Sequence, residues 1–484
     1  MSLFGGINVR GHITLIGAGP GEPELLTVKA LRKLREADAV YYDRLINTDL
    51  LNYCSERCEK IDVGKKPKHH KIPQSEIEQL IIDKAKEGKR VVRLKSGDPY
   101  VFGRGGEEGR RIVSEDISFE VIPGITSAIG GLAYAGIPIT HRDCASSFHV
   151  ITGHLKTEET QLDWAHLAHT EGTLVFLMGM SELETITTEL IAHGKAADTP
   201  VAIIRWATRQ NQTTVIGDLS SIYQVAQEAK MTSPSLIVMG DVVSHREYLN
   251  FYETKPLFGK RVTVPYTEKK KMYHRFIDAG ASVVELEKLS HTYLDNELQI
   301  SDAKELVFLD ADSVTLFVSA LIKQQQDIRT LLDKKIVTIG HHTELAIKQL
   351  GLLPEASYKS MADYQFSNRQ CQAPLYIGEK SYIQTLSAKV SLSHSWIPYE
   401  LTGNGIAKEQ LEQTDYLFFP SSKNAHYFLQ HLSDDLIPLV KETKIVVMGE
   451  MTARVFEEKN ITVISADCPT FESVLEKIGE ENEK

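Results

Sequence analysis

The sequence predicts an α/β protein of several domains. Short apolar stretches that suit strands alternate with helical patterns in the first third of the chain, and this alternation is typical of a parallel sheet. Glycine-rich turns follow several of these strands, at the edge where such sheets bind ligands. With 484 residues, the chain is long enough for about three domains.

A first lobe is expected over about residues 11–148. Its strands are predicted at 12–16, 39–42, 90–94 and 119–122, and its helices at 27–36, 75–87 and 107–114. At the strand ends stand Asp43, the glycine-rich loop 94–108 and Pro123-Gly124. A simple surface turn needs only one glycine or proline, so loop 94–108 is expected to contact a ligand through its backbone. A mobile surface loop is the alternative.

A second lobe is expected over residues 149–245. Its strands are predicted at 149–153, 173–178, 201–204, 213–216 and 235–239, with Met178 and Arg205-Trp206-Ala207 at strand ends. Residues 246–258 suit a linker. The next domain, 259–484, is expected to open with a strand at 260–265 and a helix at 267–279.

The domain 259–484 contains an approximate internal repeat. A strand, a glycine turn and a threonine-led helix occur at 335–346 and again at 444–454. Two further strands, 306–309 and 416–419, end at Asp310 and Ser421. Serine and aspartate are good N-caps, and the start of a helix attracts anions.

The turn Gly17-Ala18-Gly19-Pro20-Gly21 lies between a strand and a helix, as a dinucleotide-binding turn does. However, Glu22 stands where that fingerprint has glycine, and Pro20 lacks a backbone donor for a pyrophosphate. Asp38 or Asp43 could still bind a ribose, so a nicotinamide oxidoreductase stays open as an alternative.

Composition excludes several classes of protein. The formal net charge of −11 argues against nucleic-acid binding. No apolar stretch approaches about 18 residues and no signal pattern opens the chain, so a cytoplasmic protein without a membrane span is expected. The five cysteines suggest buried reduced thiols. Cys54 and Cys58 have helical i,i+4 spacing, but no second pair follows, so no metal is predicted.

Seven motifs then occur in the order found in one family. They are Gly17-Ala18-Gly19-Pro20-Gly21, Tyr42-Asp43-Arg44-Leu45, Val63-Gly64-Lys65, Gly97-Asp98-Pro99, Val101 to Glu108, Pro123 to Ala128 and Ala135 to Arg142. On these motifs, residues 11–245 resemble the uroporphyrinogen-III C-methyltransferases of the tetrapyrrole methylase superfamily. Glu22 and Ser96 replace the aspartate and glycine that are usual in this family.

This resemblance implies a two-lobed fold that holds S-adenosylmethionine between its lobes. It further implies two methyl transfers to uroporphyrinogen III, which give precorrin-2 for sirohaem or cobalamin, and a homodimer. The implied cofactor residues are Pro20, Ser96, Gly97, Asp98, Val101, Thr126, Ser127, Met178 and Ala207.

The resemblance also implies a set of catalytic residues. The macrocycle must lose a proton after each methyl arrives, so a base is needed, and Asp43 is the candidate. Lys65 is a candidate donor or substrate anchor, while Arg104, Glu107 and Arg142 would bind substrate carboxylates or share the proton transfer. The basic run 65–71 could steer a polyanion, or could simply be a solvated loop.

Residues 259–484 resemble uroporphyrinogen-III synthase more loosely. The similarity depends on the opening strand and helix, the glycine-threonine turns at 340–343 and 449–452, Pro420 to Asn424 and Pro469 to Leu475. It implies closure of hydroxymethylbilane to uroporphyrinogen III, with Ser421, Ser422, Asn424 and Thr452 binding the substrate. Pro420-Ser421 replaces the family's threonine-serine pair, so a noncatalytic substrate-binding module is the alternative.

Overall fold

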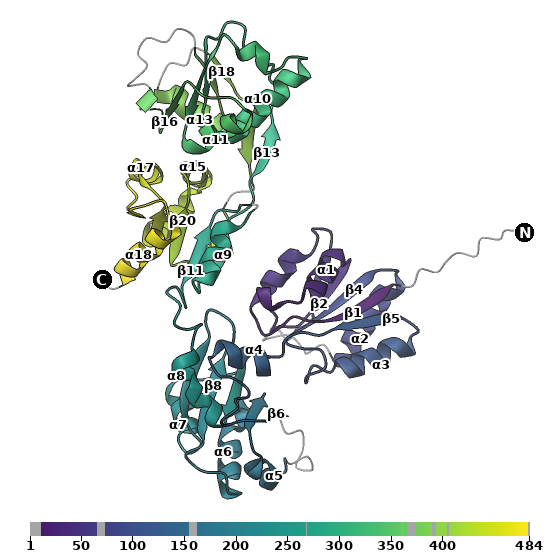
Figure 1. Ribbon diagram of the computed structural model, residues 1–484. Coiled ribbons are helices and arrows are strands. Elements are labelled where there is room, and N and C mark those ends of the chain that lie inside the picture. The colour runs from purple at the N-terminus through teal and green to yellow at the C-terminus, as the bar shows by residue number, and fades with distance from the viewer. Residues whose placement is uncertain are drawn as a thin grey trace, which may run out of the picture. The chain divides into compact units, whose positions relative to one another are not determined.

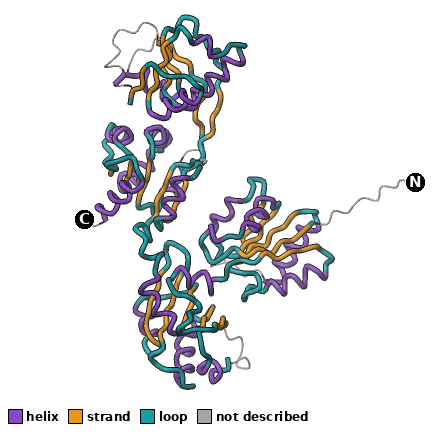
Figure 2. Tube along the Cα trace, viewed as in Figure 1, coloured by secondary structure: helices purple, strands orange, loops and turns teal. Residues whose placement is uncertain are grey.

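The computed structural model describes residues 11–64, 73–153, 162–267, 269–359, 361, 363–364, 374–389, 394–403 and 406–482 (Figure 1). Two compact units make up the chain, Met1–Gly259 with Ala279–Ala281 and Lys260–Asp278 with Ser282–Lys484. Strands form the centre of each lobe and helices lie around them (Figure 2). Within the described ranges, no helix combines the length and apolar character needed to cross a membrane.

The first lobe is a five-stranded parallel sheet with the order β3-β2-β4-β1-β5. Its strands are β1 His12–Gly17, β2 Ala39–Tyr42, β3 Glu59–Asp62, β4 Arg90–Lys95 and β5 Ser118–Ile122. Its helices are η1 Pro23–Leu25, α1 Val28–Glu36, η2 Thr48–Tyr53, α2 Gln74–Lys86 and α3 Gly105–Ser114. The four predicted strands and the parallel sheet are confirmed. Strand β3 was missed because it is mostly charged and lies at the edge of the sheet.

Helices cover both faces of this sheet. Side chains alternate along a strand, so Ile13 and Leu15 of β1 face one side and Ile16 faces the other. Ile16 packs in a cluster with residues of α1 and η2, whereas Ile13 and Leu15 pack with residues of α2 and α3. The loops after β1, β2 and β4 are thereby left at the carboxyl edge of a doubly covered sheet.

The second lobe is a mixed sheet with the order β6-β7-β10-β8-β9. Only β6 and β7 are parallel among these strands. The strands are β6 Phe148–Thr152, β7 Thr173–Leu177, β8 Pro200–Arg205, β9 Thr213–Asp218 and β10 Ser235–Met239. The helices are α5 Trp164–His169, η3 Met180–Glu182, α6 Leu183–Ala192, α7 Ile222–Glu228, η4 Asp241–His245 and α8 Arg246–Leu249. All five predicted strands are confirmed.

Helix α4, Ser127–Tyr134, joins the two lobes. It follows β5 of the first lobe, yet its buried residues Ala128 and Leu132 pack in a cluster with Ala202, Leu236 and Val238 of the second sheet. The helix therefore fixes the ends of the first sheet against the second lobe.

The second unit contains two parallel five-stranded sheets. One has the order β12-β11-β20-β21-β22, with β11 Arg261–Val264, β12 Ser282–Glu285, β20 Tyr416–Phe419, β21 Lys444–Val447 and β22 Val463–Ser465. The other has the order β16-β15-β14-β17-β18, with β14 Glu305–Phe308, β15 Lys335–Ile339, β16 Ala356–Tyr358, β17 Pro374–Ile377 and β18 His394–Trp396. An antiparallel pair, β13 Ser290–Tyr293 and β19 Tyr399–Thr402, connects these two lobes.

The helices of this unit are α9 Lys271–Asp278, α10 Ala311–Lys323, η5 Ile328–Leu331, α11 His341–Gln349, α13 Lys380–Lys389, α14 Lys408–Leu411, α15 Ser422–His431, η6 Asp434–Leu436, α16 Ile437–Glu442, α17 Glu450–Glu457 and α18 Phe471–Asn482. The predicted repeat is confirmed, because Gly340 and Gly449 cap α11 and α17 directly after β15 and β21. The predicted N-caps are also confirmed at Asp310 and Ser421, whose side chains accept bonds from the backbone of Ser313 and Asn424. The helix expected over 267–279 begins only at Lys271.

Cys54 and Cys58 do not lie on an α-helix. Cys54 ends the 3-10 helix η2, and Cys58 lies in the turn before β3. The helical i,i+4 interpretation of this pair is therefore wrong, because the tighter 3-10 turn ends before Cys58 is reached. Both thiols are free and buried, as expected, and burial raises the pKa of Cys54 to about 12.

Candidate functional site

The ends of three parallel strands meet through their glycines. Gly19 and Gly97 exchange two backbone hydrogen bonds, of 3.2 and 2.8 Å, and both have positive φ angles. A Cβ atom on Gly17 would lie 2.4 Å from the backbone nitrogen of Gly124. Side chains are thus excluded where β1, β4 and β5 end, and the backbones of these strand ends pack directly against one another.

A cavity of about 370 Å³ lies beside these turns and includes residues of both lobes of the first unit. Its lining comprises Pro20, Leu45, Ser96, Val101, Phe102, Gly103, Ser127, Leu177, Met178, Ile204, Trp206, Ala207, Arg209, Ser233, Pro234, Ser235 and Leu236. Six of the nine predicted cofactor residues are among them, namely Pro20, Ser96, Val101, Ser127, Met178 and Ala207. The volume and the mainly apolar lining suit a small organic ligand.

Three residues of the lining have left-handed backbones although they are not glycine. They are Phe102, Met178 and Trp206, with φ angles of 52, 57 and 50°. Such conformations cost about 1 kcal/mol or more each, and they persist where the surroundings require them. Met178 is 52% exposed, so its side chain faces the cavity and does not serve as core packing.

The other three predicted cofactor residues, Gly97, Asp98 and Thr126, do not line the cavity. Each forms hydrogen bonds with the backbone next to it. Asp98 accepts hydrogen bonds from the backbone nitrogens of Tyr100, at 2.8 Å, and Gly124, at 3.0 Å. Thr126 is the N-cap of α4. Asp98 therefore links the loop after β4 to the turn after β5, and Thr126 fixes the start of the helix that carries Ser127.

Sequence reasoning missed Arg209, which also lines the cavity. Its guanidinium carbon lies 4.8 Å from the ring centre of Trp206, and Nη2 donates to the carbonyl of Leu45 at 2.7 Å. Burial lowers the pKa of Arg209. No motif marks this residue in the sequence, because it depends on a contact between segments more than 150 residues apart.

Asp43 stands at the solvent end of a buried ionic network. Arg93, only 2% exposed, donates to Asp43 and to Glu108, and Lys95 donates to the same oxygen of Glu108 at 2.9 Å. The other oxygen of Glu108 is buried and has no hydrogen-bond partner. Removing charges from water is costly, so this network is maintained only where its geometry is well matched. It orients the carboxylate of Asp43, which is 32% exposed.

The other predicted catalytic residues come from separate segments of the chain. Arg104 and Glu107 pair with each other on the first turn of α3, and both are about half exposed. Arg142 is exposed in the loop after α4. Lys65 and the rest of the basic run 65–71 lie outside the described residues.

Asp38 does not fit the role of a ribose ligand. It precedes β2 and so lies at the amino end of that strand, opposite the edge that carries the glycine turns. Its carboxylate accepts hydrogen bonds from the backbone and side chain of Arg90, which lower the pKa of Asp38. Arg90 thus occupies Asp38, whereas Asp43 lies at the carboxyl edge of the sheet with 32% of its side chain exposed, so the structure weakens only the form of the nicotinamide alternative that depended on Asp38.

In the second unit, a cavity of about 90 Å³ includes residues from both lobes. It is lined by Leu309, Asp310, Glu379, Ser381, Tyr382, Leu401, Ser422, Lys423, His426 and Tyr427. Of the four predicted substrate residues, Ser422 lines this cavity, and Asn424 lines a smaller one of about 30 Å³. Ser421 caps α15, and Thr452 is only 4% exposed and lines neither cavity.

A polar cluster beside this cavity was not predicted. Tyr399 donates to Asp310 at 2.9 Å, and Lys423 donates to the Tyr399 hydroxyl at 3.1 Å and to Asp312 at 2.7 Å. Burial and the nearby carboxylates raise the pKa of Tyr399 far above its usual value. Lys423 therefore links the start of α15 in one lobe to the start of α10 in the other.

The fold and the site define a class of protein, a two-lobed α/β protein with a ligand cavity between its lobes, followed by a second two-lobed α/β unit. Comparison with known families is more specific. Residues 12–223 match the model for Tetrapyrrole (Corrin/Porphyrin) Methylases, and residues 270–476 match that for Uroporphyrinogen-III synthase HemD.

Relatives match over both halves. "Porphyrin biosynthesis protein HemD" of Ruminiclostridium josui is 32% identical over 97% of this chain and 98% of its own length. "Uroporphyrinogen-III C-methyltransferase" of Bacillus subtilis is 41% identical over 72% of this chain and 73% of its own. A solved uroporphyrin-III C-methyl transferase from Thermus thermophilus, complexed with S-adenyl homocysteine, is 38% identical over 48% of this chain and 99% of its own, with a TM-score of 0.42.

The chain belongs to the tetrapyrrole methylase family, and its second half is a uroporphyrinogen-III synthase HemD module. The resemblance inferred from the seven motifs is therefore confirmed, as is the looser one for the second half. The protein is an enzyme of tetrapyrrole methylation.

Proposed function

We propose that the first half, residues 1–245, transfers methyl groups from S-adenosylmethionine to two pyrrole carbons of uroporphyrinogen III, giving precorrin-2. The observation that carries this proposal is the cavity of about 370 Å³, which adjoins backbone turns and holds six of the residues implied for the cofactor. The family match and the relative named uroporphyrinogen-III C-methyltransferase support the same substrate.

The residues present fit this cofactor. Leu177, Met178 and Ile204 supply an apolar wall, and Ser96, Ser127 and Ser235 add polar groups to the lining that could orient an adenosyl group. S-adenosylmethionine supplies a methyl group on a sulfonium, which is already a good leaving group. The protein then contributes mainly alignment of the methyl with the attacking carbon, and such alignment is worth about 7–11 kcal/mol in favourable cases.

Asp43 is the proposed proton acceptor. Arg93 holds its carboxylate at the carboxyl edge of the first sheet, where a substrate bound over the cavity would lie. Arg104 and Arg142 are exposed and would bind the substrate's carboxylates, with Glu107 released from Arg104 as the substrate arrives. Lys65 keeps its proposed role as a donor or anchor.

For the second half, residues 259–484 after a linker at 246–258, we propose closure of hydroxymethylbilane to uroporphyrinogen III. Ser422 and Lys423 place a helix start and a cation at the cavity, which suits a substrate rich in carboxylates. Tyr399 lies within hydrogen-bonding distance of both Asp310 and Lys423 and would move a proton there. We further propose a cytoplasmic homodimer whose product feeds sirohaem or cobalamin synthesis.

The cofactor assignment is tested by calorimetric titration of the full chain with S-adenosylhomocysteine, with NAD as the comparison. We expect one binding site per chain for S-adenosylhomocysteine and no heat from NAD beyond dilution. A cofactor preference for NAD would overturn the proposal. As a matched pair of variants, Ala207→Trp fills the cavity and abolishes binding, whereas Ala196→Trp, at an exposed position away from the lining, retains it.

A further inference from the structure

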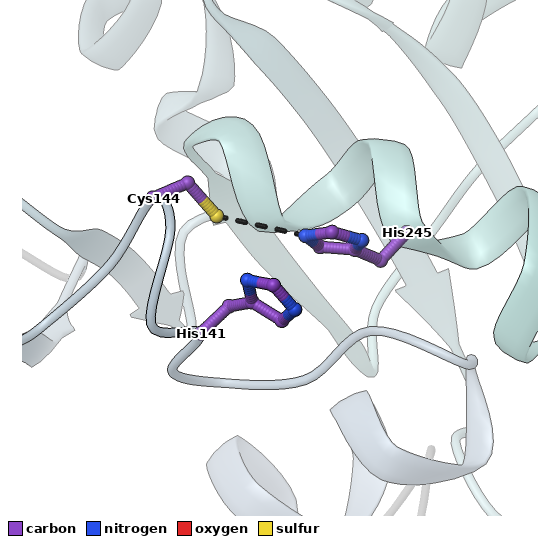
Figure 3. Close-up of side chains that lie close together, drawn as sticks. All are labelled: His141, Cys144 and His245. Carbon is purple, nitrogen blue, oxygen red and sulfur yellow. Dashed lines mark hydrogen bonds between the residues drawn. The ribbon is translucent and has the colours of Figure 1, made fainter.

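Three potential metal ligands converge where the linking segment between the lobes meets the second lobe. His141 and Cys144 belong to the turn that follows α4, and His245 ends η4. The three side chains point toward one another (Figure 3), and one ligand atom from each lies within 4.8 Å of the other two. The Sγ atom of Cys144 is 3.6 Å from Nε2 of His245, and the two histidine rings have centroids 4.1 Å apart.

The backbone holds these residues in place independently of any ligand. The turn is closed by hydrogen bonds between His141 and Ala145, of 3.0 and 2.8 Å, and by one of 3.2 Å from the Cys144 nitrogen to the His141 carbonyl. Ala145 is buried in one cluster with Val242 and Val243 of η4. Both segments that supply ligands are therefore anchored to the same apolar core, so the ligand geometry is preorganised.

The spacing matches a known coordination geometry. Zinc binds thiolate sulfur at about 2.3 Å and imidazole nitrogen at about 2.0 Å, so the two ligands are about 3.6 Å apart at a tetrahedral centre. The distance between Cys144 and His245 has this value. Ligand atoms at such a centre are about 3.3–3.6 Å apart, so the third ligand atom would need to approach by about 1.5 Å at most, which a turn of the His141 ring provides.

The surroundings also suit a cation. All three residues are partly exposed, so an ion can enter without opening the fold. An Asp143 carboxylate oxygen lies 3.5 Å from Nδ1 of His141. A carboxylate beside a histidine ligand increases ligand basicity in many zinc sites.

We propose that His141, Cys144 and His245 bind a divalent transition-metal ion of the zinc type, with water in the fourth position. Two imidazoles and a thiolate are a ligand set that such ions prefer, and three protein ligands leave one coordination position open. Cys144 loses its proton to solvent on binding. The metal ties the turn that carries Arg142 to η4, and so holds that arginine in one orientation beside the second lobe. The alternative is that these side chains bind no metal. Cys144 and His245 would then share only a hydrogen bond, and the rings of His141 and His245 would pack against each other.

The test uses the metal-free full chain without an affinity tag, titrated with Co²⁺ and then with Zn²⁺ as a competitor. We expect one Co²⁺ per chain, the intense visible absorption of a four-coordinate ion, and a near-ultraviolet thiolate-to-cobalt band, all lost when Zn²⁺ is added. Cys144→Ser should remove the thiolate band, and His245→Ala should weaken Zn²⁺ binding at least tenfold. Cys468→Ser, at an exposed free cysteine in the second unit, is the matched control and should leave both unchanged.

The melting temperature of each variant is also measured without metal. It shows whether a variant that no longer binds metal is still folded. The proposal predicts that Zn²⁺ raises the melting temperature of the parent chain and of Cys468→Ser, but not of Cys144→Ser. It is overturned if the folded parent binds no stoichiometric Co²⁺, or if the thiolate band survives in Cys144→Ser.

Discussion

The most informative side chain in the first half is Asp43, because the structure places a buried cation behind it. Arg93 is shared between Asp43 and the buried Glu108, which Lys95 and Gln74 also contact. The network explains why Arg93 and Lys95 can both be buried at the end of strand β4.

We predict that Asp43→Asn lowers the methylation rate at least 100-fold, which is about the contribution of a general base. The amide keeps the shape and can still accept a bond from Arg93, so the dissociation constant for S-adenosylhomocysteine should change less than about twofold. Single-turnover assays and calorimetry on the same preparation measure both. Asp198→Asn, at an exposed carboxylate of the second lobe, is the control and should behave as the parent chain. A normal rate in Asp43→Asn contradicts the assignment.

Arg209 permits a second prediction at the residue scale. Arg209→Ala removes the guanidinium that stacks on Trp206 and bonds to Leu45, so one wall of the cavity loses its support. We expect about a fivefold weaker affinity for S-adenosylhomocysteine, measured by calorimetry, since a partly buried cation–π contact is worth about 1 kcal/mol. Arg57→Ala, at an exposed arginine, should leave the affinity unchanged. Equal affinities in the two variants would remove Arg209 from the site.

At the scale of elements, strand ends and helix starts determine where ligands can bind. The first sheet brings the turns after β1, β4 and β5 together, and four glycines, Gly17, Gly19, Gly97 and Gly124, allow their backbones to touch. The second unit repeats the scheme with helix starts at Asp310 and Ser421. In the first unit, strands β1 and β4 beside the cavity lead into turns whose glycines have positive φ angles. In the second unit, the helices beside the cavity begin at N-cap residues.

The glycines at this junction give a matched pair of substitutions. Gly17→Ala would bring a Cβ within 2.4 Å of the backbone of Gly124, which cannot move aside, so we expect a loss of about 3 kcal/mol of stability. Gly106→Ala, in α3 with no atom near the new Cβ, should be neutral or stabilise by up to about 1 kcal/mol. Urea midpoints for the two variants should thus move in opposite directions, or only Gly17→Ala should move. A similar loss of stability in both variants would show that Gly17 does not lie in close contact with the backbone of Gly124.

A pH-dependent prediction concerns the attachment of α1 to β5. Glu120 accepts hydrogen bonds from Lys29 and Lys33, at 2.6 and 2.9 Å, and these lower its pKa from 4.5 to about 2. A lowered folded-state pKa adds stability that is fully present above pH 4.5 and is lost as the pH falls toward 2. Glu120→Gln should therefore cost about 1 kcal/mol at pH 7, and the gap in urea midpoint should narrow between pH 5 and pH 3.

The control for this experiment is Glu56→Gln, at an exposed glutamate, whose midpoint should follow that of the parent at every pH. A gap for Glu120→Gln that stays constant across the acid range would mean that its ion pairs do not stabilise the fold.

At the scale of the whole molecule, the sequence predicted the α/β class, most strands of the first half and some of the second, and the family resemblance supplied six residues of the cavity lining. Periodicity and glycine turns suffice for the fold class and for these strands, because each is coded within a few neighbouring residues. The sequence did not indicate Arg209, the Arg93–Glu108 network or the cluster around Tyr399, since each depends on contacts between distant segments. It also assigned Asp98 and Thr126 to the cofactor directly, whereas the structure shows them bonded to backbone that frames the cavity.

The central claim is that one chain both closes a linear tetrapyrrole and methylates the product. It is tested most directly by incubating the full chain anaerobically with hydroxymethylbilane, with and without S-adenosylmethionine, and analysing the products by mass and isomer. We predict uroporphyrinogen III without the cofactor and a product two methyl groups heavier with it. If only the spontaneously closed type I isomer and its methylated forms appear, the synthase activity is contradicted, and if no mass changes, the methyltransferase is contradicted as well.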